Sequence, residues 1–543
     1  MKETPHKSKP EWLENAIFYQ IYPQSFYDSN GDGIGDIPGI INKLDYIQSL
    51  GVTAVWLNPC FDSPFQDAGY DVADYYKVAK RYGTNSDLKR LFEEGRKRGI
   101  RILLDLVAGH TSIQHPWFKE SSKPERNQYT DYYIWTDAYW KWEIPGYRVV
   151  SGYSQRDGCY LTNFFYSQPA LNYGFANPDP NHPWQQPVDA PGPMRVRQEL
   201  KSIIRFWLEM GASGFRVDMA GSLIKGDPGN RETMKLWQEI RAWLDEEFPS
   251  ACLISEWGVP SQAIQAGFHM DFCIPFGMPG YTALLRKAYG PGPGTDPYGF
   301  SFFDSRGHGN IMEFLDEYLG HYQKILDMGL IAFPTGNHDI NPRISKGRST
   351  TDLELVFLFI LTMPGVPFIW YGDEIGMRSL DYLPSKEGGY NRTGARTPMQ
   401  WSEDTNAGFS TATKEKLYLP IDRAKDRPTV LQQENDPDSL LQRVRRLVAI
   451  RKAHPALQAS APFKILFAQP GVYPLVFLRE ADQESFIIAV NPFSHSVEAE
   501  FPSLSNSVPQ TIYGVAAGFI ANNNLWKIHL PGTSGGIYRV AKS

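Results

Sequence analysis

Cysteine is scarce in this chain, with four residues among 543. Cys60, Cys159, Cys252 and Cys273 are widely scattered and lack the close spacing of a metal-binding cluster. This pattern excludes the disulfide framework of small secreted domains. We therefore expect free, mostly buried thiols in a reducing compartment, and a cytoplasmic location.

A long apolar run and an excess of positive charge are also missing. Residues 1–20 contain no uninterrupted apolar segment, so no secretory signal is visible. The most apolar stretch, residues 353–372, is interrupted by Pro364, Gly365 and Pro367 before it reaches membrane-spanning length. A net charge of -6 argues against a general nucleic-acid binder. We expect neither a membrane nor a nucleic acid as a partner.

Alternating strand-like and helix-like segments dominate the chain up to residue 454. Apolar, β-prone runs are followed by amphipathic helical patterns such as residues 86–99 and 196–211. One such helix is expected over residues 36–51. The eight expected strands are residues 16–23, 52–59, 100–107, 214–219, 251–257, 271–277, 330–336 and 366–372. This repetition predicts an α/β fold, the closed (β/α)₈ TIM barrel.

Two segments break the alternation and set the domain boundaries. Residues 109–191 are rich in Tyr, Trp, Pro and Asn without a helical period, which predicts a small domain inserted after the third strand. Short alternating runs over residues 455–543 predict a C-terminal antiparallel β-sandwich. The barrel then comprises residues 12–108 and 192–454. The tryptophans of the insertion either shape a ligand subsite or form its core; they include Trp135, Trp140 and Trp142.

Charged side chains stand at the ends of the expected barrel strands. Arg216 and Asp218 lie on the same side of the fourth strand, because side chains alternate along a strand. Glu256 ends the fifth strand, and Asp339 follows the seventh. Active sites of such barrels form at these strand ends, so the three acids are expected to converge. Any one acid alone could equally be a helix cap or an ion-pair partner.

Two carboxyl groups that face each other are what cleavage of a glycosidic bond requires. One attacks the anomeric carbon, and the other protonates the leaving oxygen. Arg216 would keep Asp218 ionised and oriented. This hypothesis explains why a cation and an anion stand together at the end of an apolar strand, where an unpaired charge is costly.

The motifs around these acids resemble those of glycoside hydrolase family 13, the α-amylase family. They are "DAGYDVADY" (67–75), "DLVAGH" (105–110), "GFRVDMAG" (214–221), "LISEWG" (253–258), "TGNHD" (335–339) and "GVPFIWYGDEIGM" (365–377). The resemblance implies that Asp218 is the nucleophile and Glu256 the general acid/base. It also implies that Asp339 binds sugar hydroxyls and stabilises the transition state.

The same resemblance implies a set of sugar-binding side chains. His110 and His338 match the histidines that hold the first sugar ring. Tyr70 matches the aromatic platform under that ring, and Arg216 matches the arginine beside the nucleophile.

A narrower resemblance is to the α-glucosidase and trehalose-synthase branch. It rests on "DSNGDGIGD" (28–36), "RTPMQWS" (396–402) and "NAGFS" (406–410). In that branch, residues matching Asp67 and Arg392 pair and close the far end of the first subsite. A closed pocket implies exo action on short substrates, whereas an open groove implies endo action on polymers. Arg392 could instead be a surface arginine.

The segment "DSNGDGIGD" places oxygen ligands close together in a turn. The ligands would be Asp28, Asn30, Asp32, Asp36 and the Ile34 carbonyl. This pattern predicts a structural Ca²⁺ site, which could also take Mg²⁺. The alternative is an Asx-rich turn without an ion. No organic cofactor is expected.

Three positions depart from the family pattern. Gly109 replaces an asparagine and Ala170 replaces an aspartate, which argues against a second calcium between barrel and insertion. Met219 follows the nucleophile, where α-glucosidases carry a branched valine for 1,6 bonds or a small residue for 1,4 bonds. Methionine is neither, so the linkage preference stays open.

The leading prediction is a retaining exo-α-glucosidase that acts on short α-linked glucosides through a covalent β-glucosyl ester. One alternative is a transglycosylase or isomerase such as trehalose synthase, and another is an α-amylase that acts on short oligosaccharides. A non-catalytic relative, like the heavy chains of amino-acid transporters, is disfavoured by the three acids. The expected partner is a small oligosaccharide or disaccharide, and the oligomeric state is not specified.

Overall fold

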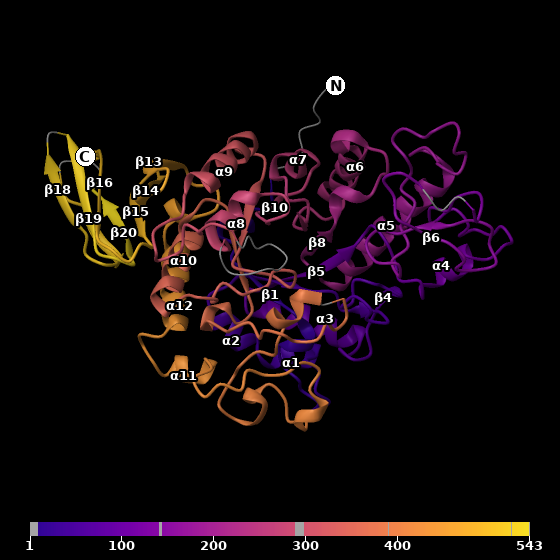
Figure 1. Cartoon of the computed structure of the whole chain (residues 1–543), viewed down its shortest axis with the longest axis horizontal. Helices are drawn as coiled ribbons and strands as arrows, with labels where there is room; N and C mark the ends of the chain where they lie inside the picture. Colours follow the sequence, from indigo (N-terminus) through magenta and orange to yellow (C-terminus); the bar gives the residue numbers. More distant parts are fainter. Residues whose placement is uncertain are drawn as a thin grey trace.

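A closed barrel of eight parallel strands forms the centre of the molecule (Figure 1). The computed structural model describes residues 9–140, 144–287, 298–388, 390–505, 507–522 and 524–541. The barrel strands are β1 (Phe18–Ile21), β2 (Ala54–Leu57), β5 (Arg101–Val107), β8 (Gly214–Asp218), β9 (Cys252–Ser255), β10 (Met270–Phe272), β11 (Leu330–Pro334) and β12 (Val366–Trp370). Their order around the barrel is β1-β12-β11-β10-β9-β8-β5-β2, which is the order along the chain. The predicted TIM barrel is confirmed.

Helices cover the outside of the barrel, so its strands are apolar and buried on both faces. The helices of this layer are α1 (Ile37–Asn42), α2 (Leu44–Ser49), α3 (Asn85–Lys97), α5 (Pro191–Met210), α6 (Arg231–Glu247), α7 (Pro260–Gln265), α8 (Pro279–Leu285), α9 (Met312–Ile325), α10 (Thr350–Thr362), α11 (Val430–Glu434) and α12 (Leu440–Ala453). The single helix predicted over 36–51 is wrong. Lys43 leaves the helical conformation at φ -109° and ψ 7°, and its Nζ atom lies over the rings of Tyr27 and Trp401.

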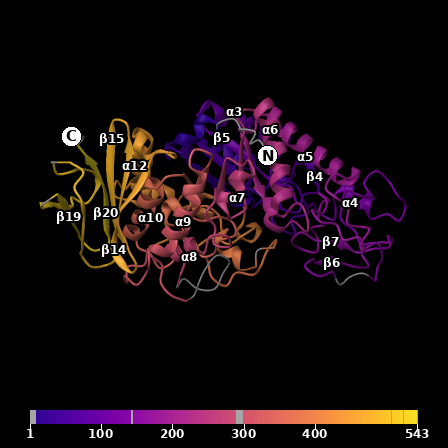
Figure 2. The same ribbon diagram turned by 90° about the horizontal axis from the view of Figure 1, so that it is seen from above.

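The segment between β5 and α5 forms a lobe at one end of the molecule (Figure 2). Its regular elements are α4 (Pro116–Ser121), β6 (Val149–Val150) and β7 (Tyr160–Leu161). Trp135 stacks on Phe118 in the core of this lobe. Trp140 is 80% exposed, and Trp142 lies outside the described residues.

The C-terminal segment forms two antiparallel sheets at the opposite end (Figures 1 and 2). A five-stranded sheet, β13-β14-β15-β20-β17, faces a three-stranded sheet, β16-β19-β18. The strands are β13 (Phe463–Gln469), β14 (Val472–Ala481), β15 (Glu484–Asn491), β16 (Val497–Pro502), β17 (Gln510–Gly514), β18 (Gly518–Asn522), β19 (Leu525–Leu530) and β20 (Ser534–Val540). Ile487 and Val476 pack against Trp526 and Ile528 between the sheets. The other face of the larger sheet packs on α10, where Phe477 contacts Phe359.

The four cysteines are buried and free, as the sequence predicts. Within the described ranges, no helix combines the length and apolar character that a bilayer crossing needs.

Candidate active site

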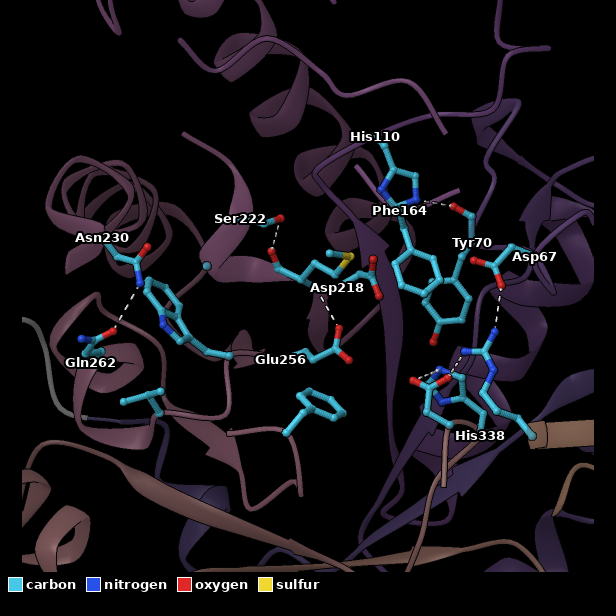
Figure 3. A pocket seen from close by; sticks show the side chains of 17 residues that line it. Asp67, Tyr70, His110, Phe164, Asp218, Ser222, Asn230, Glu256, Gln262 and His338 are labelled. Carbon is cyan, nitrogen blue, oxygen red and sulfur yellow. Dashed lines mark hydrogen bonds and ion pairs between the residues drawn. The ribbon is translucent and has the colours of Figure 1, made fainter. Parts of the chain in front are cut away.

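A cavity of about 560 Å³ opens at the carboxyl ends of the barrel strands. Eight of the nine residues predicted to act in catalysis or sugar binding line it: Asp67, Tyr70, His110, Asp218, Glu256, His338, Asp339 and Arg392. Figure 3 shows Asp218 and Glu256 near its middle, with Asp67, Tyr70 and His338 on one side and Asn230 and Gln262 on the other. The ninth residue, Arg216, is buried directly behind the two central acids.

Each central acid is positioned by the end of a barrel strand. Asp218 is the last residue of β8, and Glu256 follows β9 directly. Strands β8 and β9 pair in parallel, with Val217 opposite Ser255, so the two acids leave neighbouring strands at the same level. The backbone N–H of Met219, which has a left-handed φ of 43°, donates to Glu256 Oε2 at 2.9 Å. This bond fixes the Glu256 carboxylate beside the loop that follows Asp218.

Arg216 contacts three carboxylates at once. Its Nη1 atom lies 2.8 Å from Asp105 Oδ1 and 2.9 Å from Asp218 Oδ1. Its Nη2 atom lies 2.9 Å from Glu256 Oε2. Asp218 and Glu256 therefore meet at the two ends of one guanidinium group, which is the juxtaposition that the sequence predicts.

One buried cation cannot balance three buried carboxylates. Burial, followed by the charge of Glu256, raises the pKa of Asp218 well above its ordinary value, and Arg216 only opposes that rise. Burial also raises the pKa of Asp105 to about 6. Arg216 thus lowers the pKa of Asp218 and orients its carboxyl group, but it does not offset burial and the charge of Glu256. Acid catalysis requires that one of the two paired acids carries a proton.

A second cluster closes one end of the cavity. Arg392 Nη1 pairs with Asp339 Oδ1, and Arg392 Nη2 lies 3.3 Å from Asp67 Oδ1. Asp67 Oδ2 accepts a hydrogen bond from Gln168 at 2.8 Å. Burial alone would raise the pKa of Asp339, but His338 and Arg392 hold it well below its ordinary value. Asp339 is therefore an anion at neutral pH, and the pair predicted between Asp67 and Arg392 is present.

Both histidines of the site are buried and neutral at pH 7. Burial lowers the pKa of His110 and of His338 to about 4. His110 Nε2 donates to the Tyr70 carbonyl at 3.0 Å, and His338 Nε2 donates to Asp339 Oδ2 at 3.1 Å. The Tyr70 ring stacks on the His338 ring with centroids 5.1 Å apart. The one N–H group of each neutral ring is thus donated within the protein, which fixes both rings at the cavity wall. The Tyr70 ring adds a flat aromatic surface, which suits the face of a sugar ring.

Sequence reasoning missed the side of the cavity beyond the two acids. Its uncharged lining includes Phe164, Ser222, Asn230, Trp257, Gln262 and Phe276. Asn230 Nδ2 donates to Gln262 Oε1 at 3.3 Å. Phe164 belongs to the insertion, and the others follow β8, β9 and β10, with Gln262 on α7. Trp257 and Phe276 carried a positional signal, because they lie at the ends of the expected strands 251–257 and 271–277. The strand pattern does not define the course of the remaining segments.

The predicted metal loop is not part of the cavity lining and contacts residues 409–418, where Ser410 Oγ donates to Asp28 Oδ2 at 2.5 Å. Asp28 Oδ1 accepts the N–H groups of Asn30 and Gly31, and Asp36 caps helix α1 through Gly39. Asp28 and Asp36 are buried, yet neither forms an ion pair in the part of the chain that the structure describes. Buried carboxylates without a counter-charge fit a hard cation.

No cluster of three or more His, Cys, Asp or Glu side chains of metal-binding geometry occurs among the described residues. An ion in this loop would therefore depend also on the Asn30 side chain and the Ile34 carbonyl. The Asx turns are present, and the Ca²⁺ site stays a prediction.

Comparison with known proteins identifies the family. The family described as "Alpha amylase, catalytic domain" matches residues 20–271 and 301–460. A trehalose synthase/amylase of Mycobacterium tuberculosis is 32% identical over 548 residues, covering 93% of this chain and 86% of that protein. An oligo-1,6-glucosidase of Heyndrickxia coagulans is 30% identical over 553 residues, covering 91% of this chain and 94% of that protein.

A solved structure has the same fold over nearly the whole length of this chain. An isomaltulose synthase of Erwinia rhapontici, in complex with D-glucose, superposes with a TM-score of 0.77 at 27% identity, covering 98% of this chain and 100% of that one. The chain belongs to glycoside hydrolase family 13, the α-amylase family, in the branch of trehalose synthases and oligo-1,6-glucosidases, and is a retaining glycoside hydrolase or transglycosylase.

Proposed function

We propose that the protein is an exo-acting α-glucosidase for short α-linked glucosides. The observation that carries this proposal is the closed end of the cavity, where Arg392 joins Asp67 and Asp339. A sugar chain cannot continue past this end, so only a terminal sugar fits against Asp218. The cavity of about 560 Å³ is also of the size that encloses a small ligand.

The proposed reaction has two displacements on one anomeric carbon. Asp218 attacks that carbon, its bond to the leaving oxygen breaks, and Glu256 transfers its proton to that oxygen. The product of this step is a β-glucosyl ester on Asp218. Glu256, now a carboxylate, takes a proton from water as the water oxygen attacks the same carbon. The ester bond breaks, glucose leaves with the α configuration, and Asp218 is free again.

The charges of the site support this sequence of roles. Arg216 contacts both acids and stays charged whichever of them holds the proton. Its charged hydrogen bond to Asp218 is therefore kept while Glu256 carries the proton before the attack. The anionic Asp339 lies beside the first subsite, where positive charge develops on the sugar ring in the transition state.

A second candidate is a disaccharide isomerase of the trehalose-synthase kind. The relatives include a trehalose synthase/amylase as well as an oligo-1,6-glucosidase, at nearly equal identity. In an isomerase, the departing sugar stays in the cavity and attacks the glucosyl ester in place of water. The uncharged side that includes Trp257 and Phe276 is where that sugar would be retained.

Product analysis separates the two candidates. The protein is incubated separately with maltose, isomaltose, sucrose and trehalose, and the products are resolved by chromatography. Free monosaccharides alone support hydrolysis, whereas a new disaccharide supports isomerisation. Asp218→Asn should abolish both reactions. Activity that survives this substitution would contradict the assignment of the nucleophile.

A further inference from the structure

The closed end of the cavity is built from two loops that are far apart in sequence. Asp67 lies in the loop between β3 (Phe61–Asp62) and β4 (Asp74–Val78), and Arg392 lies in the short helix η6 (Tyr390–Ala395). The carbonyl of Gly388 accepts a hydrogen bond from Arg392. A Cβ atom added to Gly388 would lie 2.5 Å from Asp67 Oδ1, so the second loop passes directly against the first.

One cation outside the cavity holds both loops. Arg81, in the turn between β4 and α3, pairs with Glu387 through two bonds, from Nη1 at 2.8 Å and from Nη2 at 3.2 Å. Its guanidinium group also lies on the ring of Phe65, two residues before Asp67. Arg81 Nη2 further donates to Gln24 Oε1 at 2.5 Å. Arg81 therefore ties the Asp67 loop to the segment that precedes Arg392.

The pair is shielded from water and holds an unfavourable backbone conformation. The side chains of Arg81 and Glu387 are 17% and 13% exposed, and bidentate pairs of this kind are stronger than surface pairs. Glu387 has a left-handed φ of 47°. A non-glycine residue keeps such a conformation only where its surroundings hold it. Loss of the pair would release the segment before Arg392.

We propose that Arg81 is a positioning residue that keeps the sugar pocket closed and thereby sets exo action. It acts through Glu387 and Phe65 and touches no substrate. Without it, the segment before Arg392 shifts, the contact with Gly388 is lost, and the wall beside Asp67 opens. A sugar chain can then extend past the first subsite. This inference rests on the proposed exo function.

The test uses one oligosaccharide in two forms. Its linkage is whichever one the wild type hydrolyses, and its non-reducing end is either free or blocked by an acetal. The variants are Arg81→Met, Glu387→Gln and the double variant. Arg443→Met is the matched control, because Arg443 forms a partly exposed pair with Glu354 that joins α12 to α10.

The ratio of kcat/KM on the blocked substrate to that on the free one should rise about tenfold in each of the first two variants, equal to about 1.4 kcal/mol. The double variant should show no further rise, because both substitutions break one pair. Hydrogen exchange should be faster in peptides from residues 381–388. Arg443→Met should leave both the ratio and the exchange unchanged.

Three outcomes would overturn the inference: an unchanged ratio, a ratio that also rises in Arg443→Met, or unchanged exchange over residues 381–388. The ratio distinguishes opening of the pocket from general damage, which lowers both activities together. Failure of the proposed exo function would be seen in the wild-type protein itself. If that function were wrong, the wild type would cleave the blocked substrate, or it would cleave no α-glucoside.

Discussion

Asp218 combines a reactive role with an unfavourable environment. It is buried, and it shares the Arg216 guanidinium group with Asp105 and Glu256. Burial and the charge of Glu256 raise its pKa in the folded state. The carboxyl group therefore binds its proton more tightly in the native state than in the unfolded chain. Because of this difference, ionisation of Asp218 opposes folding wherever the unfolded chain has already lost the proton.

Asp218→Asn should therefore stabilise the fold while it abolishes activity. At low pH, below the unfolded-state pKa of about 4, the aspartic acid is protonated in both states and the substitution changes little. The stabilisation that the protonated acid gives to the native state is lost as the pH rises through the raised native-state pKa. The free energy of unfolding of Asp218→Asn should therefore exceed that of the wild type increasingly towards neutral pH, by about 0.5–2 kcal/mol. Urea unfolding at pH 4 and pH 7.5 measures it, and a lower midpoint for the variant at pH 7.5 would contradict this account.

Among the elements, the strands were predicted well and several helices were not. All eight strands overlap their predicted ranges, because both faces of a barrel strand are buried and most of its residues are apolar. The sixth is the weakest match, since β10 (Met270–Phe272) shares only two residues with the predicted range 271–277. The short helices α7 and α8 carry too few turns for a periodic signal, and Lys43 divides a helix that its apolar spacing predicts as continuous.

Within the site, the strand ends identified Asp218 and Glu256, but Arg81 and Glu387 could not be paired from sequence. They are 306 residues apart, and neither lies in a motif.

Removal of a bound ion tests the role of the predicted metal loop, residues 28–36. If Ca²⁺ binds there, chelation should lower the melting temperature, because Asp28 and Asp36 would be left buried without a counter-charge. Turnover measured below the new melting temperature should change less, since the loop lies outside the cavity. Differential scanning fluorimetry with and without a chelator, followed by return of Ca²⁺ or Mg²⁺, gives the readout. Unchanged melting of protein whose metal has been shown to be gone would contradict the site.

For the whole molecule, the buried Arg479 helps to hold the contact between the barrel and the C-terminal sheets, and Arg451 binds the same helix end from within the helical layer. Arg479, on β14, donates to the carbonyls of Thr362 and Gln458. Arg451, on α12, donates to the Leu361 carbonyl at 2.8 Å. Both cations satisfy carbonyl groups at the end of α10, where a helix leaves them without intrahelical partners. Burial lowers the pKa of Arg479 to about 10, so it is still charged at neutral pH.

Arg479→Met should lower the free energy of unfolding by about 2–3 kcal/mol, because charged hydrogen bonds are lost and buried carbonyls are left unpaired. The kcat/KM of the folded fraction should match the wild type, since Arg479 is remote from the cavity. Chemical unfolding and steady-state kinetics on the same preparation test both statements. Unchanged stability, or reduced activity of fully folded protein, would contradict the role assigned to this interface.

The central claim is that Asp218 becomes covalently bonded to the sugar, with Glu256 as the acid/base beside it. The most direct measurement is mass spectrometry of the Glu256→Gln variant after brief reaction with α-glucosyl fluoride, whose leaving group needs little acid assistance. The account predicts a protein heavier by one glucosyl unit, with the added mass on the peptide that contains Asp218. An adduct on another residue, or turnover of the fluoride to a β-configured product without an adduct, would contradict it.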